Sequence, residues 1–482
     1  MKHITYLAKE EIIENFQEDV LEIILSNKEI RRIIIIDNFI SLKNINLEFN
    51  QISKLEGLDN LVNLLELNIS YNQITKIEGL DNLINLHELY LESNQITKIE
   101  GLNNLVNLHK LYLESNQITK IEGLNNLINL QELELLGNHI TKIEGLDNLL
   151  NLQILSFYEN NIRKIEGLYN LVYIRKLFLE NNKITKIEEL DNLVNLRILY
   201  LSTNQITKIE GLDNLLNLRT LYLSTNQITK IKGLDNLVNL RILYLSTNQI
   251  TKIEGLDNLL NLRILYLSTN QITKIKGLDN LVNLRKIYLQ KNQINKIEGF
   301  DNLVNLCELD LSFNQINKIE GLDNLVNLCV LNLSFNQINK IEGLKQLVNM
   351  SHLHIYNNQI TEMNDPSQIT PCINLINLYY DYGIIVVHPV IIRFLNRNKL
   401  KNSEIHIFND SQNVHDNSIN RNIIESVNRL LKDVPLKEVD QTELLNDHIL
   451  TQQTKQLLLE YMSHSEEHSL LFLSFAELFG II

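Results

Sequence analysis

An asparagine stands at every twenty-second position from Asn50 to Asn358, and no insertion or deletion interrupts the series. Its members are Asn50, Asn72, Asn94, Asn116, Asn138, Asn160, Asn182, Asn204, Asn226, Asn248, Asn270, Asn292, Asn314, Asn336 and Asn358. A fixed period of this length is typical of a stack of identical supersecondary units, each of which buries its apolar face only against its neighbours. The sequence therefore predicts a solenoid.

One unit, from Leu64 to Asn85, reads LLELNISYNQITKIEGLDNLIN. Leu67 and Ile69 alternate with polar residues, which is the pattern of a short strand with one buried face. The amide of Asn72 can both donate and accept, so we predict that the stacked asparagines form an internal hydrogen-bond ladder to the backbone. Gly79, which recurs in most units, predicts a backbone bend that a side chain would resist.

The repeated pattern LxxLxLxxNxIxxIxxLxxL resembles the leucine-rich repeat in its 22-residue form, as found in the nuclear regulatory subunit of protein phosphatase 1 and in bacterial internalins. This resemblance implies an α/β solenoid with a parallel sheet on the concave side and 3₁₀ or extended segments on the convex side. The bias toward Ile, Asn and Lys, together with the loop at 409–417, also resembles leucine-rich repeat proteins of giant viruses that infect amoebae.

We predict four parts: an N-terminal helical cap with a degenerate repeat (1–44), fifteen repeats (45–365), a degenerate terminal repeat (366–383) and a small, mostly helical C-terminal capping domain (384–482). Ile12, Phe16 and Val20 recur at helical spacing and predict an amphipathic helix in the N-terminal cap. The stretch 418–431 has the same kind of apolar face, with Ser418 as its N-cap residue.

Side chains that point out of successive strands must align in columns across the concave face. One column contains aromatic residues at Tyr90, Tyr112, Phe178, Tyr200, Tyr222, Tyr244, Tyr266 and Tyr288. A second column, three residues earlier in each unit, contains Arg175, Arg197, Arg219, Arg241, Arg263 and Arg285. Tyrosine and arginine are enriched at binding hot spots, so these columns predict a binding site for a protein or an extended peptide.

An alternative explanation for the columns is recent duplication, because the repeats between 191 and 278 are almost copies of one another. Stacked tyrosine and arginine side chains can also stabilise each other through aromatic and cation–π contacts.

The formal charge of −14, from 44 basic and 58 acidic residues, disfavours general binding to nucleic acids or anionic membranes. Three cysteines are too few for a disulfide framework, which favours a reducing compartment. We find neither an uninterrupted apolar stretch of a signal peptide nor a run of roughly 20 apolar residues that could span a bilayer. These observations predict a cytoplasmic protein, located in the host cell if its origin is viral.

Two further clusters contain side chains capable of metal binding or acid–base chemistry. Cys307, Cys329, His352 and His354 occupy neighbouring rungs, but a flat row of strands does not offer zinc a tetrahedral site, so we predict free thiols and no metal. His415 lies in a polar loop near two aspartates and could support acid–base chemistry, although such clusters are more often turn or helix-cap residues. No catalytic residue and no cofactor are predicted.

The sequence therefore predicts a non-catalytic scaffold for protein–protein interaction. One alternative is a substrate-receptor solenoid fused to an effector or enzymatic domain at 384–482. A second alternative, implied by the resemblance to the phosphatase regulator, is a phosphatase regulatory subunit. The identity of the partner and the oligomeric state are left open.

Overall fold

The computed structural model describes residues 2–37 and 39–360, together with the backbone of 377–380, 383–386 and 407–408. The chain divides into two compact units, 1–412 and 413–482, and every described residue belongs to the first. The predicted boundaries of the four parts are not tested by this division and stay predictions.

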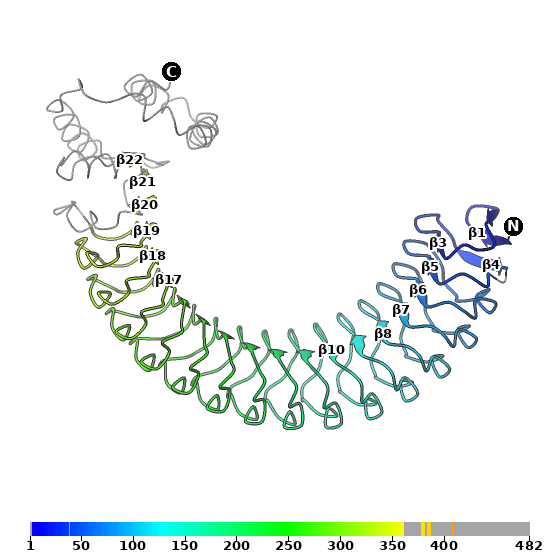
Figure 1. Cartoon of the computed structure of the whole chain (residues 1–482), viewed down its shortest axis with the longest axis horizontal. Coiled ribbons are helices and arrows are strands. Elements are labelled where there is room, and N and C mark those ends of the chain that lie inside the picture. Colours follow the sequence, from blue (N-terminus) through cyan, green and yellow to red (C-terminus); the bar gives the residue numbers. More distant parts are fainter. Residues whose placement is uncertain (1, 38, 361–376, 381–382, 387–406, 409–482) are drawn as a thin grey trace, which may run out of the picture. The chain divides into compact units, whose positions relative to one another are not determined.

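One sheet of short parallel strands runs through the repeats, and each strand pairs in register with the strand of the next repeat. The sheet begins at β3 (Glu22–Ile24), which pairs with β5. Its strands are β5 (Asn44–Asn46), β6 (Glu66–Asn68), β7 (Glu88–Tyr90), β8 (Lys110–Tyr112), β9 (Glu132–Glu134), β10 (Ile154–Ser156), β11 (Lys176–Phe178), β12 (Ile198–Tyr200), β13 (Thr220–Tyr222), β14 (Ile242–Tyr244), β15 (Ile264–Tyr266), β16 (Lys286–Tyr288), β17 (Glu308–Asp310), β18 (Val330–Asn332) and β19 (His352–His354). Within this unit the strands line the inner side of the curved stack of repeats, which we call the concave face (Figure 1).

The sheet continues past the last regular repeat. Strand β20 (Asn377–Tyr380) pairs parallel with β19, inside the segment predicted as a degenerate terminal repeat. Strands β21 (Gly383–Val386) and β22 (Ile407–Phe408) then add on in antiparallel order. The parallel solenoid therefore ends at β20.

The predicted N-terminal helix is wrong. Residues 2–36 contain β1 (Lys2–Leu7), β2 (Glu11–Phe16) and β4 (Arg32–Ile36), and β1 pairs antiparallel with both of the others. Ile12 and Phe16 pack against the core as expected, but from alternate positions of a strand. A spacing of four residues fits a helical face and is also an even number, so it fits one face of a strand equally well.

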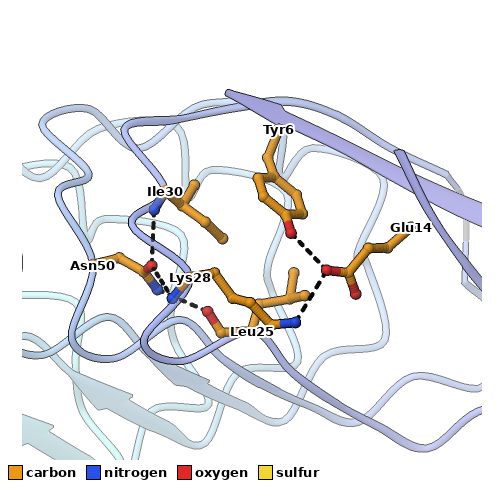
Figure 2. A network of polar contacts seen from close by, with 6 residues as sticks. All are labelled: Tyr6, Glu14, Leu25, Lys28, Ile30 and Asn50. Atoms are coloured by element: carbon orange, nitrogen blue, oxygen red, sulfur yellow. Dashed lines mark hydrogen bonds and ion pairs between the residues drawn. The ribbon is translucent and has the colours of Figure 1, made fainter. Parts of the chain in front are cut away.

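Figure 2 shows how this N-terminal hairpin is joined to the first repeats. The hydroxyl of Tyr6 donates to Glu14 Oε1 at 2.5 Å, and Lys28 Nζ lies 3.3 Å from the same oxygen. Lys28 takes the place of the asparagine in the degenerate repeat, and its backbone N–H donates to Asn50 Oδ1 at 3.0 Å. The hairpin therefore covers the open end of the stack, as solenoid ends require.

The core is a continuous apolar column, mostly of leucine and isoleucine, with phenylalanine at a few rungs such as Phe157 and Phe300. In the repeat from Leu64 to Asn85 the buried side chains are Leu64, Leu67, Ile69, Ile74, Ile77, Leu80 and Leu83, each at most 1% exposed. The degenerate first repeat keeps this register, since Ile23, Leu25 and Ile30 are buried. The regular repeats therefore bury their apolar residues against one another.

The asparagine spine forms the predicted ladder, and it links each repeat to the one before. Asn72 Nδ2 donates to the carbonyls of Leu47 at 3.0 Å, Ile69 at 3.2 Å and Ser70 at 3.1 Å. Its Oδ1 accepts from the backbone N–H of Ile52 at 2.9 Å. One amide thus satisfies backbone groups of two neighbouring turns that are buried away from water.

The convex side consists of isolated turns and extended backbone. The N–H of Leu61 donates to the carbonyl of Leu58 at 2.9 Å, and that of Leu64 donates to Leu61 at 3.0 Å. The recurrent glycine is required where φ is positive: Gly101 has φ 71°, and a Cβ there would lie 2.2 Å from the carbonyl oxygen of Ile77 in the preceding repeat. The glycine prediction is therefore confirmed.

No helix of any kind occurs within the described residues, so the α/β class is corrected to a parallel β-solenoid. The helical C-terminal domain is likewise not supported, because the described residues of 384–482 belong to β21 and β22. The predicted helix at 418–431 and the loop around His415 lie outside the described residues.

Candidate functional site

The strand register brings the predicted residues together in the predicted columns. Phe178 pairs with Tyr200 across β11 and β12, Tyr200 with Tyr222, and so on to Tyr288 of β16. The arginines align beside them, since the N–H of Arg197 donates to the carbonyl of Arg175 at 2.9 Å and the same bond recurs up to Arg285. Whether these side chains bind a partner stays a prediction.

The six aromatic rings from Phe178 to Tyr288 form one uninterrupted parallel stack. Neighbouring ring centroids are 4.3 to 4.5 Å apart, and the interplanar angles lie between 5° and 12°. Tyr90 and Tyr112 form a separate pair at 4.7 Å. Each inner ring therefore covers the faces of its neighbours, and only ring edges and hydroxyl groups are left uncovered.

The arginine column is exposed in all six rungs. Within the described part of the chain, none of its members forms an ion pair or lies over an aromatic ring. The concave lysines Lys110 and Lys286 differ, because they lie 2.9 Å from Glu88 and 2.6 Å from Glu308. Of the alternative explanation for the columns, the cation–π contacts are therefore not supported, whereas the aromatic contacts are present in the stacked rings.

The N-terminal third of the concave face carries a group of partly buried glutamates. Burial raises the pKa of Glu114 to about 8, with Glu92 and Glu134 nearby adding to the effect. Burial also raises the pKa of Glu134 and of Glu180 to about 7. One carboxyl oxygen of Glu114 and one of Glu180 are buried without a hydrogen-bond partner among the described residues. These carboxyls hold protons at a higher pH than free glutamate does.

Two of the concave glutamates are held in the charged form. Burial raises the pKa of Glu88, but hydrogen bonds from Tyr90 and Lys110 outweigh it, and the net shift is downward. Glu308 behaves in the same way, with Lys286 and Tyr288 as its donors. The hydroxyl of Tyr288 donates to Glu308 Oε1 at 2.7 Å, which closes the C-terminal end of the aromatic stack.

The predicted free thiols lie side by side. Cys307 and Cys329 are half-buried on neighbouring rungs, in the column that the arginines occupy in earlier repeats. Burial, together with a hydrogen bond to Cys307, raises the pKa of the Cys329 thiol. Across the described ranges, no three potential metal ligands converge at one point.

Sequence reasoning missed two surface features that follow the same period. Asn85 Nδ2 donates to the carbonyl of Val62 at 2.9 Å, and Asn239 Nδ2 donates to that of Leu216 at 2.8 Å, so an exposed second asparagine ladder runs along the array. Beside it lies an exposed aliphatic column, whose side chains are 37 to 64% exposed. Its members are Ile40, Val62, Ile84, Val106, Ile128, Leu150, Val172, Val194, Leu216, Val238, Leu260, Val282, Val304, Val326 and Val348. Both features can be read from the recurrent NLVNL and NLLNL segments, in which the third residue belongs to the aliphatic column and the fourth to the second asparagine ladder.

Comparison with known families agrees with this architecture. A family model described as "Leucine Rich repeats (2 copies)" matches residues 40–82, 62–104, 84–126, 106–148, 150–192, 174–214, 216–258, 238–280, 260–303 and 326–368. A second, described as "Leucine rich repeat", matches residues 283–338. The parallel solenoid with its asparagine ladder thus defines a repeat protein, and the chain belongs to the leucine-rich repeat family. No curated protein sequence matches it.

Several solved structures share the fold. An internalin, InlF, of Listeria monocytogenes is 32% identical with a TM-score of 0.56, and the match covers 61% of this chain and 88% of the internalin chain. A leucine-rich repeat protein of Leptospira interrogans is 28% identical with a TM-score of 0.62, and the match covers 81% of this chain and 96% of the Leptospira chain. The functional domain of InlJ from Listeria monocytogenes, which includes a cysteine ladder, is 24% identical with a TM-score of 0.54. The match covers 64% of this chain and 65% of the InlJ chain.

These comparisons bear on the class of protein and leave the finer predictions untested. The resemblance to the phosphatase regulator, the viral origin and the cytoplasmic location stay predictions. Within the described ranges, we find no helical segment with the length and apolarity that a membrane crossing requires.

Proposed function

We propose that this chain is a non-catalytic scaffold that binds a partner protein through the concave face of strands β11 to β16. The observation that carries the proposal is the coincidence of two columns over the same six rungs. The aromatic stack offers a row of tyrosine hydroxyls, and the arginine column offers six exposed guanidinium groups without ion pairs in the described part of the chain. Such surfaces combine contact area with hydrogen-bond donors.

The rigidity of the site also supports binding. The strands are fixed by the parallel sheet and by the asparagine ladder behind it, as at Asn226, whose Nδ2 donates to the carbonyl of Leu201 at 2.9 Å. A ring stacked on both sides has little freedom left to lose when a ligand arrives, which lowers the entropic cost of association. The alternative of an effector domain at 384–482 concerns residues that lie almost entirely outside the described part.

The experiment is selection of a random peptide library displayed on phage against the full chain, followed by binding measurements on single peptides. The test variant is Tyr222→Phe/Tyr244→Phe, which keeps the stacked rings and removes two hydroxyls. The control is Tyr169→Phe/Tyr173→Phe, two exposed tyrosines on the turns outside the sheet. We expect the selected peptides to bind the control as tightly as the wild type. They should bind the test variant about five- to tenfold more weakly, because one to two hydrogen bonds are lost.

Hydrogen exchange on the peptide complex locates the contact directly. Protection should concentrate in residues 175–288. If the selected peptides bind both double variants equally, or protect the convex turns instead, the concave face of β11 to β16 is not the binding surface.

A further inference from the structure

The arginine column is a cationic row of limited length between two acidic zones. It occupies six consecutive rungs, from Arg175 to Arg285. Glu132 of β9 lies on its N-terminal side, and Asp310 of β17 lies on its C-terminal side. The chain as a whole carries a formal charge of −14, so this row is a local reversal of sign. A surface zoned in this way selects a ligand by the position of its charges as well as by their number.

Like charges on neighbouring strands destabilise a sheet, and this row repeats the arrangement five times. Neighbouring rungs lie ~4.8 Å apart, so the row spans about 24 Å. The nearby carboxylates do not neutralise it: Glu308 pairs with Lys286, and the pKa of Glu180 is raised to about 7 by burial, so that carboxyl is partly protonated at neutral pH. No carboxylate in the described part of the chain therefore pairs with the row, which leaves it open to an anionic ligand.

The aromatic stack decides which kind of anion fits. Proteins that bind single-stranded nucleic acids stack the bases on exposed aromatic faces. Here the rings of Tyr200, Tyr222, Tyr244 and Tyr266 are covered on both faces by their neighbours at 4.3 to 4.5 Å, so no inner face is open to a base. Hydroxyl groups and guanidinium groups remain, and both donate to carboxylate and backbone carbonyl oxygens.

We propose that the ligand of β11 to β16 is an extended, carboxylate-rich segment of a protein, about seven residues long. The length follows from the 24 Å row and a rise of ~3.4 Å per extended residue. Aspartate or glutamate side chains face the arginine column, and backbone carbonyls accept from the tyrosine hydroxyls. This inference rests on the proposed function and specifies the chemistry of the partner at the same site.

The test uses fluorescein-labelled octaglutamate and octaglutamine as probes of the full chain, with fluorescence anisotropy at several salt concentrations. The variant is Arg219→Gln/Arg241→Gln/Arg263→Gln. Its matched control is Lys230→Gln/Lys252→Gln/Lys274→Gln, which removes the same charge from exposed lysines outside the strands of the same three repeats. Circular dichroism should keep its shape in both variants, because all six side chains are exposed, and the arginine variant should melt no lower than the wild type, because it loses like charges on neighbouring strands.

We expect octaglutamate to bind the wild type and octaglutamine not to bind. The arginine variant should bind octaglutamate at least about tenfold more weakly and with a flatter salt dependence, whereas the lysine variant should change affinity less than about twofold. Equal losses in the two variants, or no binding of octaglutamate at low salt, would overturn the proposal. So would tighter, arginine-dependent binding of octathymidylate. If octaglutamate fails but neutral peptides from the display selection bind the concave face, the proposed scaffold function is retained and only the acidic chemistry of the ligand is wrong.

Discussion

At the scale of single residues, the asparagine side chain does most to hold one repeat to the next. Asn226 donates to the carbonyls of Leu201, Leu223 and Ser224, and its Oδ1 accepts from the N–H of Ile206. Leu201 and Ile206 belong to the preceding repeat, whereas Leu223 and Ser224 belong to the same repeat as Asn226. The groups of Leu201, Ile206 and Leu223 are buried, so water does not replace a lost partner there, whereas the bond to Ser224 is partly buried.

Replacement of Asn226 by alanine should therefore lower the free energy of unfolding by about 3 kcal/mol, since buried donors and acceptors are left without partners. The control is Asn239→Ala in the outer ladder, where an exposed side chain makes one bond, to the carbonyl of Leu216. That change should cost less than about 1 kcal/mol. Urea denaturation followed by circular dichroism measures both, and similar costs at the two sites would show that burial of the inner ladder does not matter.

A second residue-scale prediction concerns Glu189, which has φ 57° at the position where the neighbouring repeats have Gly167 and Gly211. The left-handed conformation costs a residue with a side chain roughly 1–2 kcal/mol. Glu189→Gly should therefore raise stability by about 1 kcal/mol, because the exposed contact with Lys164 that it loses contributes little.

The control for Glu189 is Glu188→Gly, which also removes a carboxylate near Lys164. Glu188 is not among the residues with positive φ in the described ranges, so glycine there should lower the urea midpoint. A gain in stability at both positions would mean that the charge, and not the backbone conformation, is responsible.

At the scale of the strands and the turns that follow them, the glutamates of the N-terminal third make stability depend on pH. Burial raises the pKa of Glu114 from 4.5 to about 8 in the folded chain, so the folded state keeps a proton that the unfolded chain releases. By linkage, the stabilisation is complete below about pH 4.5 and is lost as the pH rises through 8. Thermal melting between pH 5 and 9 should therefore show a falling midpoint.

Glu114→Gln should reduce the slope of this pH profile, with Glu134 and Glu180 supplying the remainder, and should raise the melting temperature most at pH 8 and above, where the wild type must bury a charge. Glu122→Gln, an exposed residue in the same repeat, serves as the control and should leave the slope unchanged. A slope that is undiminished in Glu114→Gln would assign the pH dependence to other groups.

Much at the element scale followed from the period alone, because a fixed repeat sets the register of every strand. The aromatic and arginine columns, the ladder and the positive-φ glycines were predicted in this way. The N-terminal hairpin was not, since the spacing of Ile12 and Phe16 suits both a helix and a strand. Aromatic contacts between stacked tyrosines were anticipated, but their geometry was not predictable, because the pattern places Tyr222 beside Tyr244 without fixing the angle between their planes. The raised pKa of Glu114 depends on burial, which sequence spacing does not report.

At the scale of the whole array, the hydrogen bonds of the spine reach only the neighbouring repeat, so a repeat protein tolerates the loss of one complete unit. Deletion of 220–241 would join Arg219 to Ile242 and let Asn248 take the partners of Asn226, which are the same residue types. We expect circular dichroism to keep its shape and the melting temperature to stay within about 3 °C.

A deletion of half this length is the control. Removal of 220–230 shifts every later strand out of register, so buried leucines would meet turn positions, and cooperative melting should be lost. If the complete-repeat deletion also failed to fold, coupling would extend beyond nearest neighbours.

The aromatic stack has an optical consequence. The chain has no tryptophan, so its near-ultraviolet emission comes from tyrosine, and part of that signal belongs to rings held face to face at 4.3 to 4.5 Å. Closely stacked rings exchange excitation energy, which depolarises and quenches their emission. Any ligand that moves one ring changes this exchange along the whole row. The protein thus carries its own reporter at the proposed site, and titrations can be followed by its own fluorescence without a dye.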